Sequence, residues 1–266
     1  MENWLNLDNK IIIVTGGTNG IGRSIVEGLL GQNAIVINFD LSDREQFSHL
    51  NYYFYETDIS KKDQVNSNVE KVCEKFKRID GLVNNAGIAL PGVLVNSEGT
   101  NEYELTEEMF DKSYAVNQKG TFLVTQAVAR KMIPRKEGVI INISTESARE
   151  GSVGQTFYVA TKGAINSMTC TWAKELGKYN IRVIGVAPGV MEETDLRSEH
   201  YESTLAFSRN ITVEELRRGY ESSSNIPLGR SGKLEEVADT VCFYLSERSS
   251  YISGIITNVA GGKSRG

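Results

Sequence analysis

The sequence predicts an α/β fold in which helices cover both faces of a parallel sheet. Seven short apolar runs, rich in β-branched residues, alternate with longer segments of helical periodicity, which is the pattern of repeated strand–helix–strand units. Several runs are apolar on both faces, as in strands that are covered by helices on each side. The 266 residues suit one α/β domain with a sizeable core. No linker or repeat divides them, so we expect a single domain over residues 1–266.

The predicted elements follow one another in a regular order. The expected strands are residues 10–15, 34–39, 51–56, 79–84, 138–143, 181–187 and 255–259. The expected helices are residues 20–31, 61–77, 107–134, 155–178 and 233–247. Asn33 stands where the first helix would turn into the second strand, and asparagine is a common substitute for glycine at a left-handed helix cap. The segments 88–105 and 190–228 are expected to be irregular, and we expect 190–228 to bind substrate because long loops in a compact fold are usually functional.

Composition argues against several classes of function. A formal net charge of −5 is unlike a general nucleic-acid-binding protein, which usually presents a basic face. No run of about 18 apolar residues would form a transmembrane helix, and the N-terminal residues lack the pattern of a signal peptide. The cysteines at 73, 170 and 242 form no metal-binding or redox pair, and the two histidines are too isolated for a zinc site. These features predict a cytoplasmic protein without a bound metal or a membrane partner.

A glycine-rich stretch, TGGTNGIG at residues 15–22, follows the first expected strand and opens the first expected helix. Gly16, Gly20 and Gly22 would allow a tight turn, a close approach of the backbone to a pyrophosphate, and a helix N-terminus that favours anions. Its position between strand and helix predicts a dinucleotide site, which Thr18, Asn19 and Ile21 would complete.

Asp40 indicates which dinucleotide is bound. It ends the second expected strand, eighteen residues after Gly22. A carboxylate there accepts hydrogen bonds from the adenosine ribose hydroxyls and repels a 2′-phosphate. Residue 41 is not basic, and Asn19 occupies the loop position where a basic residue would favour NADP. The sequence therefore predicts NAD.

Tyr158 and Lys162 lie four residues apart in an expected helix, so their side chains share one face. A lysine ammonium within about 4–6 Å favours the tyrosinate and lowers the pKa of the phenol by roughly 1–3 units. We therefore expect Tyr158 to be an acid–base catalyst for an alcohol or a carbonyl. Thr145 supplies a hydroxyl on the preceding strand, thirteen residues before the tyrosine. Ser144 should face the other way, because successive strand residues point to opposite sides.

Six motifs occur along the chain in a fixed order: TGGTNGIG (15–22), TDIS (57–60), NNAG (84–87), AVNQKG with its Asn117, YVATK (158–162) and APG (187–189). Over essentially its full length the chain resembles the short-chain dehydrogenase/reductase family. The resemblance implies an oxidoreductase with a three-layer Rossmann-type fold, a doubly wound sheet of about seven parallel strands with helices on both faces. It also implies a homotetramer with helices near 107–134 and 155–178 at the interface.

The resemblance assigns a catalytic tetrad of Asn117, Thr145, Tyr158 and Lys162. Tyr158 would be the acid/base, and Thr145 would hydrogen-bond the substrate oxygen. Lys162 would bind the nicotinamide ribose, and Asn117 would anchor a water of the proton relay. The family usually has serine where this chain has Thr145, whose added methyl makes the side chain stiffer.

The same resemblance predicts further contacts with NAD, besides those of Tyr158 and Lys162. They are Asp58 and Ile59 at the adenine, Asn85, Ala86 and Gly87 at the ribose, and Pro188, Gly189, Val190 and Thr194 at the carboxamide.

The residues alone indicate only a polar substrate with a secondary alcohol or a ketone. Glu146, Arg149, Glu150 and Gln155 are either hydrogen-bonding partners of a polyol or solvated loop residues. An arginine fork matches a phosphate well, and the segment 190–228 offers arginines that are otherwise surface charge: Arg197, Arg209, Arg217 and Arg218.

Longer stretches resemble one branch of the family, which interconverts D-sorbitol 6-phosphate and D-fructose 6-phosphate with NAD. They include NQKGTFLVTQAVARKM, RNITVEELRRGY, IPLGRSGKLEEVAD and TNVAGGKSRG. A phosphorylated polyol and its ketose are therefore the expected substrates. The alternatives are the same chemistry on an unphosphorylated polyol, a sugar acid or a 3-oxoacyl thioester, and an NAD-binding sensor without turnover.

Overall fold

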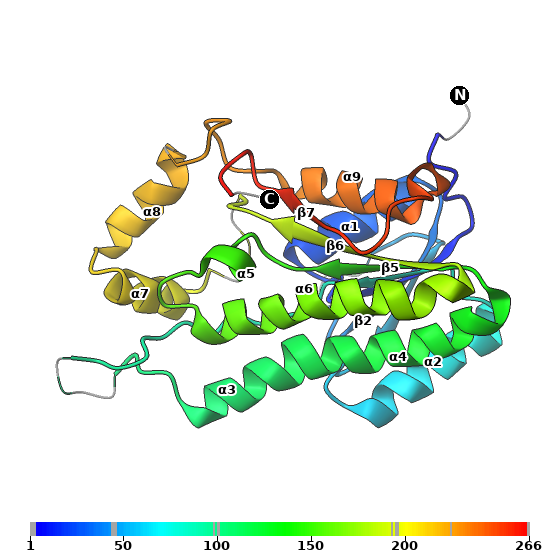
Figure 1. Ribbon diagram of the computed structural model, residues 1–266, viewed down its shortest axis with the longest axis horizontal. Coiled ribbons are helices and arrows are strands. Elements are labelled where there is room, and N and C mark those ends of the chain that lie inside the picture. The colour runs from blue at the N-terminus through cyan, green and yellow to red at the C-terminus, as the bar shows by residue number, and fades with distance from the viewer. Residues whose placement is uncertain are drawn as a thin grey trace.

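Seven parallel strands form one sheet in the computed structural model, in the order β3-β2-β1-β4-β5-β6-β7 (Figure 1). They are β1 (Ile11–Thr15), β2 (Ile35–Asp40), β3 (Tyr52–Glu56), β4 (Gly81–Asn84), β5 (Gly138–Ile143), β6 (Ile181–Pro188) and β7 (Ile256–Val259). The predicted seven-stranded parallel fold is confirmed. The structure describes residues 4–43, 47–97, 99, 102–192, 194, 197–223 and 225–264, without the side chains at 221 and 222.

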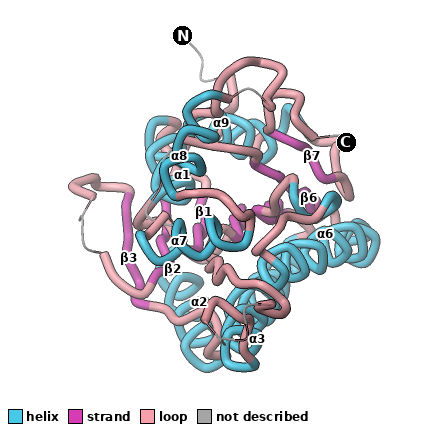
Figure 2. Tube along the Cα trace, turned by 90° about the vertical axis from the view of Figure 1, so that its left-hand side faces the viewer, coloured by secondary structure: helices cyan, strands magenta, loops and turns pink. Residues whose placement is uncertain are grey.

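Helices cover both faces of this sheet and make three layers (Figures 1 and 2). One face carries α1 (Gly20–Gly31) and α9 (Leu234–Leu245), and the other carries α2 (Lys62–Phe76), α4 (Thr121–Met132) and α6 (Thr156–Leu176). The alternation of side chains along a strand divides the core. Ile12 and Val14 of β1 pack with the first group of helices, and Ile11 and Ile13 pack with the second. Apolar runs on both faces of the strands thus produce the two cores.

The order of the strands creates a crevice at the carboxyl end of β1. The chain runs outward from β1 to β2 and β3, and then returns to β4 on the other side of β1. Ligands of open α/β sheets bind where the strand order reverses in this way. The glycine-rich stretch follows β1, and NNAG begins at Asn84, which pairs with Thr15 across the two strands. The topology therefore brings both motifs to one place.

The helix expected at 107–134 is divided into three parts. These are α3 (Glu107–Ser113), a π-helical turn η1 (Tyr114–Gly120) and α4. A π-helical turn inside a helix is often found at a functional site. Shorter elements are α5 (Ser147–Glu150), η2 (Ile133–Arg135), η3 (Gly177–Tyr179) and η4 (Glu247–Ser249). Asn33 has the expected left-handed backbone, with φ of 58°.

The prediction that residues 190–228 are irregular is wrong, because two helices occupy this segment: α7 (Glu199–Ser208) and α8 (Val213–Ser222). The hydroxyl of Ser198 caps α7 at 3.2 Å from a backbone N–H, and Thr212 and Glu215 form a capping box at the start of α8. Leu205 and Leu216 are buried against each other's helices in a small cluster of their own. Among the described residues, no helix is both long and apolar enough to cross a membrane.

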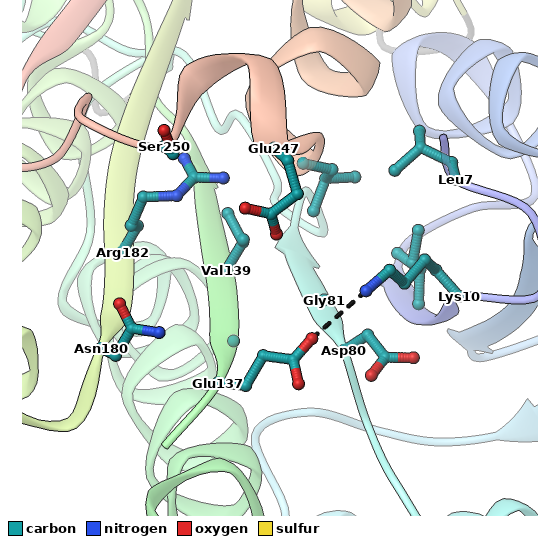
Figure 3. Close-up of a pocket in the computed structure, with 13 residues that line it drawn as sticks. Leu7, Lys10, Asp80, Gly81, Glu137, Val139, Asn180, Arg182, Glu247 and Ser250 are labelled. Carbon is teal, nitrogen blue, oxygen red and sulfur yellow. Dashed lines mark hydrogen bonds and ion pairs between the residues drawn. The ribbon is translucent and has the colours of Figure 1, made fainter. Parts of the chain in front are cut away.

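A small charged cavity, of about 60 Å³, lies at the amino ends of the strands (Figure 3). Its charges pair with one another and with their neighbours. Lys10 Nζ lies 3.2 Å from Glu137 Oε1, and the carboxylate of Asp80 pairs with Arg78 at 2.9 Å and with Arg135 at 3.1 Å. These ion pairs stabilise the amino-terminal edge of the sheet. The predicted site residues lie at the opposite, carboxyl-terminal edge, in the crevice.

Candidate active site

The glycine loop is packed so closely that side chains would not fit at two of its positions. Gly16 has φ of +66°, and a Cβ there would lie 2.8 Å from Cα of Ala86. A Cβ on Gly22 would lie 1.9 Å from the carbonyl oxygen of Gly16. The backbone of the loop is therefore bare at the N-terminus of α1, as a dinucleotide cradle requires. The residues present fit a nicotinamide dinucleotide.

The NNAG segment holds this loop in place. The side-chain amide of Asn85 donates to the carbonyl oxygens of Thr15 and Gly16, at 3.1 and 2.8 Å. Thr15 Oγ1 in turn accepts from the backbone N–H groups of Asn85 and Ala86, at 3.0 and 3.1 Å. The Asn85 side chain thus positions the cradle, and its contact with the ribose stays a prediction.

Asp40 lies beside the same loop, at the end of β2. Its carboxylate accepts from Thr18 N at 3.0 Å and from Leu41 N at 2.7 Å. Leu41 is 66% exposed and brings no positive charge to this carboxylate. A half-buried carboxylate at this place is suited to ribose hydroxyls and opposes a 2′-phosphate.

The predicted adenine contacts lie at the start of α2. Asp58 Oδ1 accepts from the backbone and the hydroxyl of Ser60, at 2.9 and 2.7 Å. Ile59 is buried, and a Cβ on Gly120 would lie 2.7 Å from its Cδ1. Asp58 therefore has a structural role in the turn, whether or not a nucleotide is bound.

Three of the predicted catalytic side chains gather where β5 ends and α6 begins. Lys162 Nζ lies 5.8 Å from the centroid of the Tyr158 ring and donates to the carbonyl oxygen of Ile143 at 2.6 Å. The side chain of Thr145 hydrogen-bonds to the Tyr158 phenol. Ser144 faces away as expected, because its hydroxyl donates to the carbonyl oxygen of Lys162 at 3.4 Å.

The prediction that Lys162 lowers the pKa of Tyr158 is wrong for this structure. Burial raises the pKa of Tyr158 to about 12, and the hydrogen bond with Thr145 opposes that shift only in part. The ammonium of Lys162 is directed at the carbonyl oxygen of Ile143 rather than at the phenol. Burial also lowers the pKa of Lys162 to about 8. At neutral pH the phenol is therefore protonated and the lysine is mostly charged, so Tyr158 is ready to donate a proton.

Asn117 lies on the π-helical turn and connects the segment after NNAG to α6. Its side chain accepts from Ile88 N at 2.8 Å and donates to Ile88 O at 2.9 Å and to Thr161 Oγ1 at 3.1 Å. A Cβ on Gly87 would lie 3.3 Å from Asn117 Oδ1 and 3.5 Å from Lys162 Nζ. All four members of the predicted tetrad thus lie at the carboxyl edge of the sheet.

The predicted carboxamide contacts follow β6. Gly189 N donates to Val259 O at 2.9 Å, and Val190 O accepts from Gly232 N at 3.0 Å. A Cβ on Gly20 would lie 3.5 Å from Cβ and Cγ2 of Thr194. The chain after β6 therefore lies against the glycine loop, which places the predicted carboxamide contacts next to the predicted pyrophosphate cradle.

The predicted substrate residues have diverse surroundings. The buried carboxylate of Glu146 pairs with Lys263 and accepts from Ser264, so it holds the C-terminal residues instead of facing a substrate. Arg149 is exposed on α5. Arg197 donates to Met191 O at 2.7 Å, and its guanidinium lies 4.0 Å from the centroid of the Tyr220 ring. Gln155 is the N-cap residue of α6, the helix that carries Tyr158 and Lys162.

Tyr201, on α7, is a residue of the site that the sequence did not indicate. Its hydroxyl accepts from Gln155 Nε2 at 2.6 Å. Burial raises its pKa, and the charges of Tyr220, Tyr158 and Arg209 act on it. The helix caps at Ser198 and Thr212 are the signals that could have revealed α7 and α8, and with them this side chain.

A glycine loop without side chains and a buried tyrosine–lysine pair are the features expected of a nicotinamide-dependent oxidoreductase. Residues 10–204 match the family model described as short chain dehydrogenase. The chain belongs to the short-chain dehydrogenase/reductase family.

Three relatives show how far the similarity extends. The chain is 53% identical over 269 residues to sorbitol-6-phosphate 2-dehydrogenase of Klebsiella pneumoniae, with 100% of both chains covered. It is 37% identical to a 3-oxoacyl-(acyl-carrier-protein) reductase of Thermotoga maritima, covering 97% of this chain and 99% of that one. The ligand-free structure of Thermoplasma acidophilum aldohexose dehydrogenase superposes with a TM-score of 0.83 at 26% identity, covering 97% and 95% of the two chains.

Proposed function

We propose that the protein interconverts D-sorbitol 6-phosphate and D-fructose 6-phosphate with NAD, using Tyr158 as the acid/base. The hydrogen bond between Thr145 and the Tyr158 phenol, beside the buried Lys162, carries the chemical part of the proposal. The full-length 53% identity to a sorbitol-6-phosphate 2-dehydrogenase supports the choice of substrate.

NAD would bind along the crevice at the carboxyl ends of the strands. The bare backbone at Gly16 and Gly22 would hold the pyrophosphate, and Asp40 would hold the adenosine ribose. Lys162 would bind the nicotinamide ribose, and the segment from Pro188 would bind the carboxamide. When bound, NAD supplies the acceptor for the hydride that leaves C2 of the polyol.

Residues of the chain would donate and accept the proton that accompanies hydride transfer. In reduction of the ketose, the protonated phenol of Tyr158 donates to the substrate oxygen, which the hydroxyl of Thr145 holds in place. In oxidation of the polyol, the deprotonated side chain of Tyr158 takes up the proton of the C2 hydroxyl. Because the pKa of Tyr158 is about 12, oxidation is expected to accelerate as the pH rises from 6 to 8.

The substrate is tested by comparing NADH formation from D-sorbitol 6-phosphate with that from D-sorbitol. A large preference for the phosphorylated polyol is expected, and equal values of kcat/KM would refute this part of the proposal. Reduction of fructose 6-phosphate, followed by NADH absorbance, tests the reverse reaction. Binding of NADH without its consumption would favour the alternative of a sensor without turnover. A 3-oxoacyl thioester belongs in the same assay, because a reductase of such substrates is 37% identical.

The cofactor is tested with NADP in place of NAD and with the variant Asp40→Ala. Removal of the carboxylate is expected to weaken NAD binding and to reduce the discrimination against NADP. An unchanged ratio of kcat/KM for the two nucleotides would contradict the role of Asp40. The cytoplasmic location and the homotetramer remain predictions, which fractionation of cells and light scattering would test.

A further inference from the structure

The C-terminal end of α7 lies directly on the loop that leads into the helix of Tyr158. Gly154, in this loop, has φ of +81°, and a Cβ there would lie 2.8 Å from Cβ and Oγ of Ser208. The loop is also tied to the segment after NNAG, because Gly92 N donates to Gly154 O at 2.9 Å. Figure 1 shows α7 beside the start of α6, with α8 next to α7. Helix α7 therefore packs against the loop that precedes Tyr158.

Polar groups surround the phenol of Tyr201, and Arg209, the residue directly after α7, is one of them. The charges of Tyr158 and Arg209 both act on the Tyr201 phenol, which hydrogen-bonds to Gln155 at 2.6 Å. Arg209 Nη2 donates to Ser152 Oγ across a long 3.5 Å. The guanidinium and the Tyr158 phenol are therefore both near the phenol of Tyr201.

Arg209 differs from Arg217 in having no ion pair among the described residues, and from Arg197 in making only one long hydrogen bond. Arg217 binds the buried carboxylate of Glu202 with two donors, at 2.9 and 2.7 Å, and Arg197 is bound to a carbonyl oxygen and an aromatic ring. Arg218 is exposed on α8. Arg209 is half-buried and has no ion-pair partner among the residues that the structure describes. A half-buried guanidinium of this kind is suited to a phosphate, which accepts two parallel hydrogen bonds from it.

We propose that Arg209, with Ser152 beside it, binds the phosphate of the substrate while Tyr158 acts at the other end of the carbon chain. The inference rests on the proposed function, and it assigns the phosphate to one of the four candidate arginines. The reacting C2 and the phosphate on C6 stand near opposite ends of the polyol, so the phosphate requires a cation that is set apart from the tetrad. Tyr201 and Gln155 would line the intervening space.

The test uses Arg209→Gln, with Arg218→Gln as the matched control that removes the same charge from an exposed position of α8. For each protein, kcat/KM is measured with D-sorbitol 6-phosphate and with D-sorbitol. The ratio of the two values is expected to fall about 100-fold in Arg209→Gln, mainly through KM, since two charge-assisted hydrogen bonds are lost. It is expected to stay as in the wild type in Arg218→Gln. Inorganic phosphate should compete with the phosphorylated substrate in the wild type and much less in Arg209→Gln.

Failure of the inference can be told apart from failure of the proposed function. A wild type without preference for the phosphorylated polyol refutes the proposed function. A wild type with that preference, together with an unchanged ratio in Arg209→Gln, overturns the inference alone. Equal losses with both substrates would assign Arg209 a structural role and would also overturn it. If Arg209→Gln does not fold, competition by inorganic phosphate in Arg209→Lys decides, since inhibition as strong as in the wild type contradicts recognition by a guanidinium fork.

Discussion

Replacing Lys162 by methionine is expected to abolish turnover and yet leave the fold at least as stable at neutral pH. Lys162 is 5% exposed, and burial lowers its pKa from 10.5 to about 8. At about 1.4 kcal/mol per pH unit, burial disfavours the charged ammonium by about 3 kcal/mol. Methionine removes this cost but leaves the carbonyl oxygen of Ile143 without its donor, which costs about 1–3 kcal/mol. The net change at pH 7 is therefore between zero and about 2 kcal/mol of stabilisation.

The pH dependence of this difference has a definite sign. The folded wild type binds fewer protons than its unfolded chain between about pH 8 and pH 10.5, because its lysine has the lower pKa. The wild type therefore gains stability as the pH rises through that window. The methionine variant lacks this gain. The free energy of unfolding of the variant, minus that of the wild type, is expected to fall by about 3 kcal/mol from pH 7 to pH 10.5.

Denaturant unfolding at a series of pH values measures this difference, and titrations common to both proteins cancel in it. Lys174→Met is the control, since Lys174 is exposed on the same helix and its loss removes no buried charge. The free energy of unfolding of Lys174→Met, minus that of the wild type, should not change with pH. If the same difference for Lys162→Met also does not change with pH, the claim that Lys162 is buried as an ammonium is refuted.

Three further outcomes are expected. Thr145→Val should lower kcat by roughly 100-fold, because the Thr145 hydroxyl hydrogen-bonds to the Tyr158 phenol. Thr145→Ser keeps this hydroxyl and should retain most of the activity. Similar rates for the two variants would contradict this role. Lys263→Met should lower the free energy of unfolding by about 1–3 kcal/mol, since Glu146 is buried but its partner is part-exposed, and an unchanged denaturation midpoint would argue against the pair. Arg217→Met should lower it by a similar amount, about 1–3 kcal/mol, by leaving Glu202 buried without its cation, whereas Glu202→Gln in the Arg217→Met background should restore part of the loss.

The fold could be predicted because its signals are local. Strands that are apolar on both faces can only be interior strands, and Ile11 to Val14 show this over four consecutive residues. The glycine loop was likewise predictable, since the lack of space at Gly16 and Gly22 leaves no other residue possible. The spacing of Tyr158 and Lys162 placed both on one face of α6, and strand alternation correctly separated Thr145 from Ser144.

The remaining features depend on contacts between distant parts of the chain. Glu146 pairs with a lysine 117 residues away, and no local pattern indicates such a partner. The pKa of Tyr158 depends on how deeply the phenol is buried and on which group accepts the hydrogen bond from the Lys162 ammonium. Neither follows from the spacing of the two residues in the sequence. Helix α7 carries only a weak apolar periodicity, and half of the residues of α8 are charged. Tyr201 was therefore hidden in a segment expected to be irregular, and Arg209 could not be distinguished there from the other candidate arginines.

The central claim, that the Tyr158 phenol moves the proton next to a bound nicotinamide, is tested most directly by Tyr158→Phe. Phenylalanine keeps the ring and removes only the hydroxyl that Thr145 contacts. Turnover of D-sorbitol 6-phosphate and of fructose 6-phosphate is expected to fall at least about 100-fold, with the affinity for NADH changed by no more than roughly twofold. A variant that retains more than about a tenth of the wild-type turnover, or that loses NADH affinity in step with rate, would contradict it.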